Sequence, residues 1–234
     1  MAELGISAVV VADAAALAEA AASWTAERIS AAVEARGRCF LALAGGETPK
    51  GCYQRLAQPP YQRDLPWPAV YVYWSDERQV PLDDPASNFA MAKTALLDHV
   101  PVRSDQIFPL TGDPTSALRR VPAYDRGIPR FDIIHLGLGE DGHTASLFPG
   151  SPALQEQRAL VVDVHDAPKP PPDRLTFTLP LINAARAVLF TVQGAGKREA
   201  LARVLRRDPA APASHVQSVD GELEFIVDQA AFGR

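Results

Sequence analysis

Residues 131–150 read FDIIHLGLGEDGHTASLFPG, and they carry the strongest fold signal in the chain. The first third is a short apolar run, typical of a strand buried on both faces of a parallel sheet. Three glycines follow within six residues, and they let main-chain amides approach a ligand closely. His143 comes next, a side chain that exchanges protons near neutral pH. A short helix is expected from Thr144, as N-cap, to Phe148. Open α/β sheets bind ligands at such strand–turn–helix junctions.

Similar alternation of apolar runs and amphipathic segments continues along the chain. Strands are expected at 8–11, 39–43, 70–74, 107–110, 159–164, 174–179, 187–192 and 222–227. Helices are expected at 14–35, 89–99, 181–185 and up to about 206, and one more begins with Thr48 as N-cap and Pro49 as its first residue. Three prolines limit any helix between 112 and 130. This order predicts one α/β domain over residues 1–234, with a doubly wound, mostly parallel Rossmann-like sheet and helices on both faces.

Composition narrows the class of protein. The 234 residues are 47% hydrophobic and 22% charged, as in ordinary globular proteins. The formal net charge of −5 argues against a general nucleic-acid or membrane surface, so any cations that bind an anionic ligand must be local. Cys39 and Cys52 are expected to be reduced thiols. There is no basic-then-apolar leader, and a cytoplasmic location is expected.

Four expected strand ends carry candidate site residues. They are Gly45 to Thr48, Ser75 to Arg78, Gly137 to His143, and Gly194 to Lys197. Parallel strands would bring all four to the same edge of the sheet, with two amide-rich loops, an imidazole, a carboxylate and two cations. That set suits a small phosphorylated substrate. Taken alone, Gly45-Gly46 is better explained as a tight turn that needs its glycines for geometry, and a surface charge remains a fair explanation of Glu77.

Several other chemistries have little support. There is no G-x-S-x-G motif, so Ser146 is better explained by packing or capping than as a nucleophile. The five histidines lack metal-ligand spacing, and His135, within an apolar strand, is expected to be a hydrogen-bonded core residue. Residues 137–142 fit the spacing G-x-G-x-x-G, but Pro149-Gly150 ends the following helix too early for a dinucleotide fold.

The motifs together resemble 6-phosphogluconolactonases, in order, from about residue 40 to 205. The resemblance rests on the block DGHTASLFPG at 141–150, SDER at 75–78 with Ser87-Asn88 after it, GGxTP at 45–49, and RLT at 174–176 with GxxK at 194–197. The GGxTP block is shared with glucosamine-6-phosphate deaminases. Those deaminases usually have Asp-Glu-Tyr where this chain has Asp76-Glu77-Arg78, and a different sequence after the Asp-Gly-His, so both differences favour the lactonase.

The resemblance implies a hydrolase that works without metal or cofactor in the oxidative pentose phosphate pathway, opening 6-phospho-D-glucono-1,5-lactone to 6-phosphogluconate. It implies that His143 is the general base, and that Asp141 orients His143, contacts sugar hydroxyls or shapes the turn. The substrate-binding residues that it implies are Gly45, Gly46, Thr48, Asp76, Arg78, Arg174 and Lys197. One departure is Glu47, where the family usually has Ser; a carboxylate there would repel a phosphate unless it points away.

Two alternatives stay open on the sequence. One is a glucosamine-6-phosphate isomerase/deaminase, which Arg78 disfavours. The other is a non-enzymatic sugar-phosphate-binding module, disfavoured because the chain has no spare segment for a DNA-reading helix-turn-helix. We expect a small phosphorylated lactone as partner, no nucleic acid or membrane, and a monomer or small homo-oligomer. Residues 167–173, with four prolines, are expected to form a stiff, extended loop.

Overall fold

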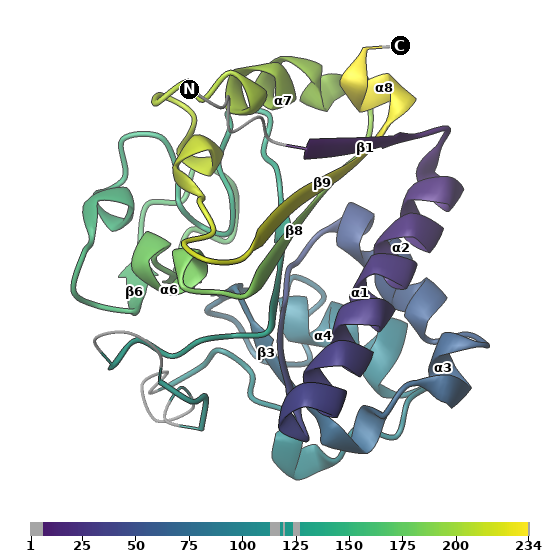
Figure 1. The fold of residues 1–234 in the computed structure, drawn as a ribbon. Coiled ribbons are helices and arrows are strands. Elements are labelled where there is room, and N and C mark those ends of the chain that lie inside the picture. The colour runs from purple at the N-terminus through teal and green to yellow at the C-terminus, as the bar shows by residue number, and fades with distance from the viewer. Residues whose placement is uncertain (1–6, 113–117, 119, 124–126, 234) are drawn as a thin grey trace.

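A six-stranded parallel sheet forms the centre of the chain, with strand order β1-β9-β8-β5-β2-β3 (Figure 1). The computed structural model describes residues 7–112, 118, 120–123 and 127–233. The strands of the sheet are β1 (Ser7–Val11), β2 (Cys39–Leu43), β3 (Val70–Trp74), β5 (Ile133–Gly137), β8 (Ala187–Val192) and β9 (Glu222–Asp228). The predicted α/β fold with a mostly parallel sheet is therefore confirmed.

The central strands are buried because their sequences are mostly apolar. Every residue of β2 and β8 is buried, as expected for strands with helices or other strands over both faces. The thiols of Cys39 and Cys52 are buried and free, which confirms the prediction of reduced cysteines. No helix in the part of the chain that the structure describes combines the length and apolarity needed to span a bilayer.

Helices pack on both sides of this sheet. Helix α1 (Ala14–Arg36) begins where the Asp13 carboxylate accepts the amide of Ala16 at 2.9 Å, and it ends at Gly37, whose φ is +72°. Helix α2 (Glu47–Leu56) lies beside α1, whereas α6 (Leu179–Asn183) lies on the other side (Figure 1). The other α-helices among the described residues are α3 (Tyr61–Asp64), α4 (Asn88–Ala92), α7 (Arg198–Leu205) and α8 (Gln229–Phe232). Short 3₁₀ turns occur at Trp67–Ala69, Ser104–Gln106, Pro152–Gln155, Ala195–Lys197 and Pro212–His215.

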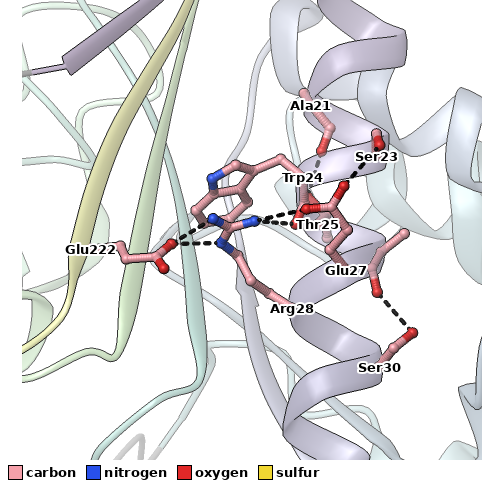
Figure 2. A network of polar contacts seen from close by, with 9 residues as sticks. Ala21, Ser23, Trp24, Thr25, Glu27, Arg28, Ser30 and Glu222 are labelled. Atoms are coloured by element: carbon pink, nitrogen blue, oxygen red, sulfur yellow. Dashed lines mark hydrogen bonds and ion pairs between the residues drawn. The ribbon is translucent and has the colours of Figure 1, made fainter.

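An ion pair fastens α1 to the start of β9 (Figure 2). Arg28 donates from Nε and Nη2 to one carboxylate oxygen of Glu222, at 2.8 and 2.6 Å. The same guanidinium lies 3.9 Å from the ring centroid of Trp24, one turn earlier on the helix. The ion pair with two hydrogen bonds and the stacking contact hold α1 against the start of β9.

His135 is a core histidine, as predicted. Its Nε2 lies 2.9 Å from the hydroxyl of Thr25, which itself donates to the carbonyl of Ala21, so Nε2 is assigned as the protonated nitrogen. The ring stacks on Tyr53, with centroids 5.8 Å apart. Complete burial lowers the pKa of His135 to about 3, so this imidazole is neutral under ordinary conditions.

A second sheet departs from the expected pattern. Three strands, β4 (Asp76–Arg78), β7 (Arg174–Phe177) and β6 (Val161–Val164), form an antiparallel sheet of their own, in the order β4-β7-β6. Residues 75–78 were expected to be a polar strand end, but after Ser75 the chain leaves the main sheet and pairs with β7. All four residues of β7 are buried, so its alternating sequence does not give one exposed face.

Three local predictions were wrong. Thr48 is not the N-cap of α2 and Pro49 is not its first residue, because the helix begins two residues earlier, at Glu47, with Gly46 in the cap position. Residues 144–148 form no helix; Thr144 and Leu147 pair as a tight bridged turn in which Ala145 has a φ of +48°. Residues 107–110 make a single bridge to β3 instead of a strand. The expected helix 89–99 is α4 followed by a π-helical turn at Lys93–Leu97. Much of the segment 112–130 lies outside the described residues.

Candidate functional site

A cavity of about 270 Å³ opens at the carboxyl edge of the parallel sheet, where β2, β3, β5 and β8 end. This is the edge at which open α/β sheets bind ligands. Its wall is formed by the turn at Gly45-Gly46, the glycine turn at the end of β5, strands β4 and β7 of the second sheet, and the loop 167–173. The lining residues are Ala44, Gly45, Gly46, Asp76, Arg78, Asn88, Gly137, Leu138, Gly139, His143, Ala145, Phe148, Lys169, Pro170, Arg174 and Lys197.

His143 and Asp141 form a hydrogen-bonded pair at this cavity. The Nδ1 atom of His143 lies 2.5 Å from Oδ1 of Asp141, and the same oxygen accepts the main-chain amide of His143 at 3.1 Å. The ring rests against Phe148, with centroids 4.6 Å apart. Because Nδ1 faces the carboxylate, the proton is assigned there, and Nε2 is left as the basic nitrogen.

Close packing explains the glycine at position 139. A Cβ added there would lie 2.0 Å from Nδ1 of His143 and 2.6 Å from the Asp141 carboxylate, closer than any real contact. The turn is closed by main-chain hydrogen bonds from Gly139 to the carbonyl of His143 and from Gly142 to that of Gly139. Gly142 has a φ of +87°, which other residues rarely adopt. The sequence therefore needs glycine here to hold the imidazole in place.

Burial and charge shift the pKa values of this pair in a way that favours a neutral base. Desolvation lowers the pKa of His143, and the negative charge and hydrogen bond of Asp141 oppose part of that effect. For Asp141, burial raises the pKa, but the hydrogen bonds and charge of His143 outweigh it and leave the pKa below its ordinary value. Near neutral pH the pair is thus an imidazole beside a carboxylate.

Four cationic side chains surround the cavity against a single lining carboxylate. Arg78, Lys169, Arg174 and Lys197 are the cations, and Asp76 is the carboxylate. Nη1 of Arg78 donates to the carbonyl of Ala86 at 2.6 Å, while its buried Nε has no hydrogen-bond partner within the described residues. Burial lowers the pKa of Lys197, and the charge of Glu140 partly offsets that shift. The excess of positive charge, in a chain of net charge −5, makes this cavity suited to an anion.

Arg174 also holds the loop 167–173 over the cavity. Its guanidinium donates to the carbonyl oxygens of Lys169, at 2.7 Å, and Pro171, at 3.0 Å. The side chain is 4% exposed and lies over the ring of Phe148, 5.5 Å from the centroid. A buried guanidinium that binds two loop carbonyls fixes the loop, and it brings Lys169 to the wall of the cavity.

Glu77 organises the segment that carries Arg78 and Asn88, so its interpretation as a surface charge was wrong. It is 1% exposed, and its carboxylate accepts the amides of Arg78, Asn88 and Phe89, each at 2.7 Å. Ser87 adds a hydroxyl at 3.1 Å. Burial raises the pKa of Glu77, and the hydrogen bonds from the three main-chain amides oppose this shift. The carboxylate therefore acts as a fixed anchor between β4 and the start of α4.

Ser146 supports Asp76 and has no geometry of a nucleophile. The hydroxyl is fully buried and donates to the Asp76 carboxylate at 2.7 Å, and the Ser146 amide donates to Thr176 at 3.1 Å. Asn88 donates to the other Asp76 oxygen at 3.3 Å and to the Asp76 carbonyl at 2.9 Å. These contacts fix the orientation of Asp76 at the wall of the cavity.

Most of the residues that the sequence singled out lie together. Gly45, Gly46, Asp76, Arg78, His143, Arg174 and Lys197 all line the cavity, whereas Asp141 reaches it through His143 and Thr48 is not part of the lining. Asn88, Phe148 and Lys169 line it as well, and sequence reasoning did not assign them to the site. A Cβ at position 45 would lie 1.9 Å from the amide oxygen of Asn88, so glycine at this position makes room for the Asn88 side chain.

Glu47 points away from this cavity. It lines a separate, open hollow of about 850 Å³ between α2 and α4, where its carboxylate pairs with Lys50 at 3.2 Å. The larger hollow holds no hydrogen-bonded imidazole–carboxylate pair within the described residues, whereas the smaller cavity does. The expected repulsion between Glu47 and a phosphate is therefore avoided.

Comparisons with known proteins agree with the geometry. The family described as Glucosamine-6-phosphate isomerases/6-phosphogluconolactonase matches residues 12–225. A 6-phosphogluconolactonase of Synechocystis sp. is 41% identical over 218 residues, covering 87% of this chain and 88% of the relative. A 6-phosphogluconolactonase of Rattus norvegicus is 39% identical over 228 residues, covering 88% and 84%.

Solved structures give the same result for the fold. The structure of 6-phosphogluconolactonase from Trypanosoma brucei has a TM-score of 0.85 at 29% identity, covering 97% of each chain. A monomeric glucosamine-6-phosphate deaminase has a TM-score of 0.80 at 22% identity, covering 97% of this chain and 99% of that one. At that lower identity the likeness shows the fold alone.

Proposed function

Because the chain belongs to the family of glucosamine-6-phosphate isomerases and 6-phosphogluconolactonases, we propose that it is a lactonase that hydrolyses 6-phospho-D-glucono-1,5-lactone to 6-phospho-D-gluconate. The observation that carries this proposal is the His143–Asp141 pair at the wall of a cavity with four cationic side chains. The substrate carries a phosphate, which the cationic side chains would bind, and a lactone carbonyl, which the imidazole–carboxylate pair would act on.

In the proposed reaction, His143 acts as a general base. Nε2 removes a proton from a water molecule while the water oxygen attacks the lactone carbonyl carbon, which gives a tetrahedral intermediate. The intermediate collapses by breaking the bond between that carbon and the ring oxygen, and the ring oxygen takes the proton from the imidazolium. Asp141 stabilises the imidazolium and holds the Nδ1–H tautomer.

The cationic side chains bind the phosphate in this proposal. Arg78 offers its buried Nε, Lys197 and Lys169 offer ammonium groups, and the Gly45-Gly46 turn offers main-chain amides just before α2 begins. Arg174 contributes charge and keeps Lys169 in place. Asp76, fixed by Ser146 and Asn88, is placed to accept a hydrogen bond from a sugar hydroxyl.

A direct assay of lactone hydrolysis tests the proposal. The lactone is produced in the cuvette from glucose-6-phosphate and its dehydrogenase, and its loss is followed with and without the protein, with the spontaneous rate subtracted. We expect acceleration for the phosphorylated lactone and little for unphosphorylated gluconolactone. His143→Gln should lower kcat by about 10²–10⁴.

His165→Gln is a matched control, because His165 pairs with Asp173 at 3.0 Å outside the cavity and is exposed. It should keep the wild-type rate. Equal rates for His143→Gln and the wild type would refute the proposed base. A folded protein with no lactonase activity would refute the proposed reaction and would make glucosamine-6-phosphate deamination the next assay.

Two further proposals concern location and assembly. We propose a cytoplasmic protein on the basis of two free thiols and a net charge of −5, and a monomer or small homo-oligomer. Analytical ultracentrifugation at several concentrations tests the assembly state.

A further inference from the structure

The turn after β8 brings Lys197 to the wall of the cavity that holds His143. Strand β8 ends at Val192, and residues 193–197 are exposed or half-buried. The amide of Lys197 donates to the carbonyl of Gly194 at 3.0 Å, which closes a 3₁₀ turn. This bond gives the turn its shape, but it does not fix the turn relative to the sheet. That placement depends on a contact with another part of the chain.

Asp228 supplies the contact from the end of β9. Both of its carboxylate oxygens accept the main-chain amide of Gly194, Oδ1 at 3.0 Å and Oδ2 at 3.1 Å. The side chain is 6% exposed, so water competes little for these hydrogen bonds. No other side chain in the described part of the chain hydrogen-bonds to residues 193–197. The carboxylate of Asp228 therefore fixes the turn that carries Lys197.

Helix capping alone does not explain a carboxylate at this position. Asp228 is also the N-cap of α8, where Oδ1 accepts the amide of Ala231 at 2.7 Å. One oxygen atom is enough for a cap, and Ser or Asn provides it as well as Asp does. Among the described residues, Oδ2 accepts the Gly194 amide and nothing else. A side chain with two acceptor atoms thus joins the turn after β8 to the helix after β9.

Helix α8 in turn contacts the start of α7, the helix that follows Lys197 (Figure 1). Nη2 of Arg198 donates to the carbonyl of Ala230 at 3.4 Å. Gly233 packs so closely that an added Cβ would lie 3.2 Å from Nε of Arg198. The end of the chain therefore holds the main chain on both sides of Lys197, through Asp228 before it and through α8 after it.

We propose that Asp228 is a positioning residue for substrate binding, because it holds the turn from which Lys197 reaches the cavity. The inference rests on the proposed function, in which Lys197 binds the substrate phosphate. A lysine ammonium binds as a point charge on a flexible stem, so the position of its main chain decides how well it reaches the phosphate. Asp228 does not line the cavity, and its loss should weaken substrate binding while the chemistry at His143 continues.

Steady-state kinetics of Asp228 variants separate this role from a catalytic one. Asp228→Ala should raise KM about tenfold and leave kcat within about twofold of the wild type, because it weakens a phosphate contact and leaves the base in place. Asp228→Asn keeps one acceptor oxygen and should raise KM by about threefold. Asp13→Ala is the matched control: Asp13 caps α1 by accepting one amide at 2.9 Å and lies outside the cavity lining. Its loss should lower stability and change neither constant.

A double-mutant cycle with Lys197→Gln separates positioning from a general loss of stability. If Asp228 acts through Lys197, the Asp228→Ala substitution should raise KM by less than about twofold in the Lys197→Gln background. Damage that does not pass through Lys197 would raise KM by the same factor in both backgrounds. Circular dichroism checks that each variant is folded. Should Asp228→Ala fail to fold, the cycle with Asp228→Asn gives the same comparison.

Calorimetric titration with 6-phospho-D-gluconate measures the same effect without turnover. The dissociation constant should rise about tenfold in Asp228→Ala and change little when Lys197→Gln is already present. A wild type that binds this sugar phosphate but does not hydrolyse the lactone would refute the proposed function and leave the positioning role standing. Wild-type KM and affinity in the folded Asp228 variant, or equal fold changes in the two backgrounds, would overturn the positioning role.

Discussion

Asp141→Asn is the substitution that tests the proposed chemistry most sharply. It keeps the size of the side chain and removes the negative charge that faces Nδ1 of His143 at 2.5 Å. An amide can also present its NH₂ group to Nδ1, which would favour the tautomer with the proton on Nε2, the nitrogen required as base. The variant is therefore expected to fold normally and to catalyse slowly.

The size of the effect follows from the hydrogen bond and its exposure. A hydrogen bond to a charged group contributes about 1.5–3 kcal/mol, which corresponds to roughly 10- to 150-fold in rate. The side chain of Asp141 is 38% exposed, so solvent screening places the loss toward the lower part of that range. We expect kcat at neutral pH to fall roughly 10- to 50-fold.

The pH profile gives a second and independent readout. Only neutral His143 can act as the base, so activity is lost as the pH falls through its pKa. The charge of Asp141 raises that pKa against the larger effect of burial. Removing the charge must lower the pKa of His143, so the acid limb of kcat/KM should move to lower pH while the plateau falls.

The measurement is the coupled lactonase assay from acidic to neutral pH, corrected for spontaneous hydrolysis at each pH. Asp173→Asn is the matched control, because Asp173 is the partner of exposed His165 at 3.0 Å. The reasoning would be refuted by an acid limb that moves to higher pH, or by a plateau within twofold of the wild type.

Three further predictions follow from the same structure. Lys169→Gln should raise KM about tenfold and leave kcat within twofold of the wild type, as measured by initial rates. Lys93→Gln is the control, because Lys93 lies outside the cavity, and it should change neither constant. The same KM in the two variants would contradict the assigned phosphate contact. Gly139→Ala should lower kcat by about 10², because the added Cβ would lie 2.0 Å from Nδ1 of His143 and would push the imidazole out of position. A crystal structure of the variant with the imidazole unmoved would contradict that cause. His135 has a folded-state pKa of about 3, lower than in the unfolded chain, so stability is present above pH 6.5 and is lost as the pH falls toward 3, by up to about 5 kcal/mol. Urea unfolding of His135→Phe should show a correspondingly smaller loss on acidification, and an identical loss would refute this assignment.

The parallel sheet and its edge could be predicted from the sequence because the signals are local. Apolar runs at 39–43, 70–74 and 187–192, the last with Thr191 inside it, match β2, β3 and β8 residue for residue. Glycines directly after β2 and near the end of β5 then mark the strand ends. Since parallel strands end at one edge, Gly45, Arg78 and the other predicted cavity residues had to lie near one another.

The remaining features depend on contacts between distant segments. The antiparallel sheet pairs β4 with β7, about 100 residues apart in the chain. No hairpin turn connects these two strands, so no local sequence pattern predicts that they pair. The turn at 144–147 overrides the helix preference of its residues, because Thr144 donates to the carbonyl of Gly137 at 2.9 Å. Lys169 is held at the cavity by a hydrogen bond from Arg174 to its main-chain carbonyl. The periodicity of the sequence carries no signal for such a contact.

The position of β1 has a consequence for how the chain folds during synthesis. In the main sheet β1 has one neighbour, β9, with Ser7 opposite Glu224 and Val11 opposite Asp228. A ribosome has therefore completed every residue that lines the cavity at the carboxyl edge by Lys197, before it reaches Glu222, where the partner of β1 begins. Until β9 emerges, both β1 and the outer side of β8 are open edges that can pair with other chains. Contacts of such long sequence separation form slowly, so the nascent chain passes through an aggregation-prone interval that ends only when residues 222–228 join the two halves.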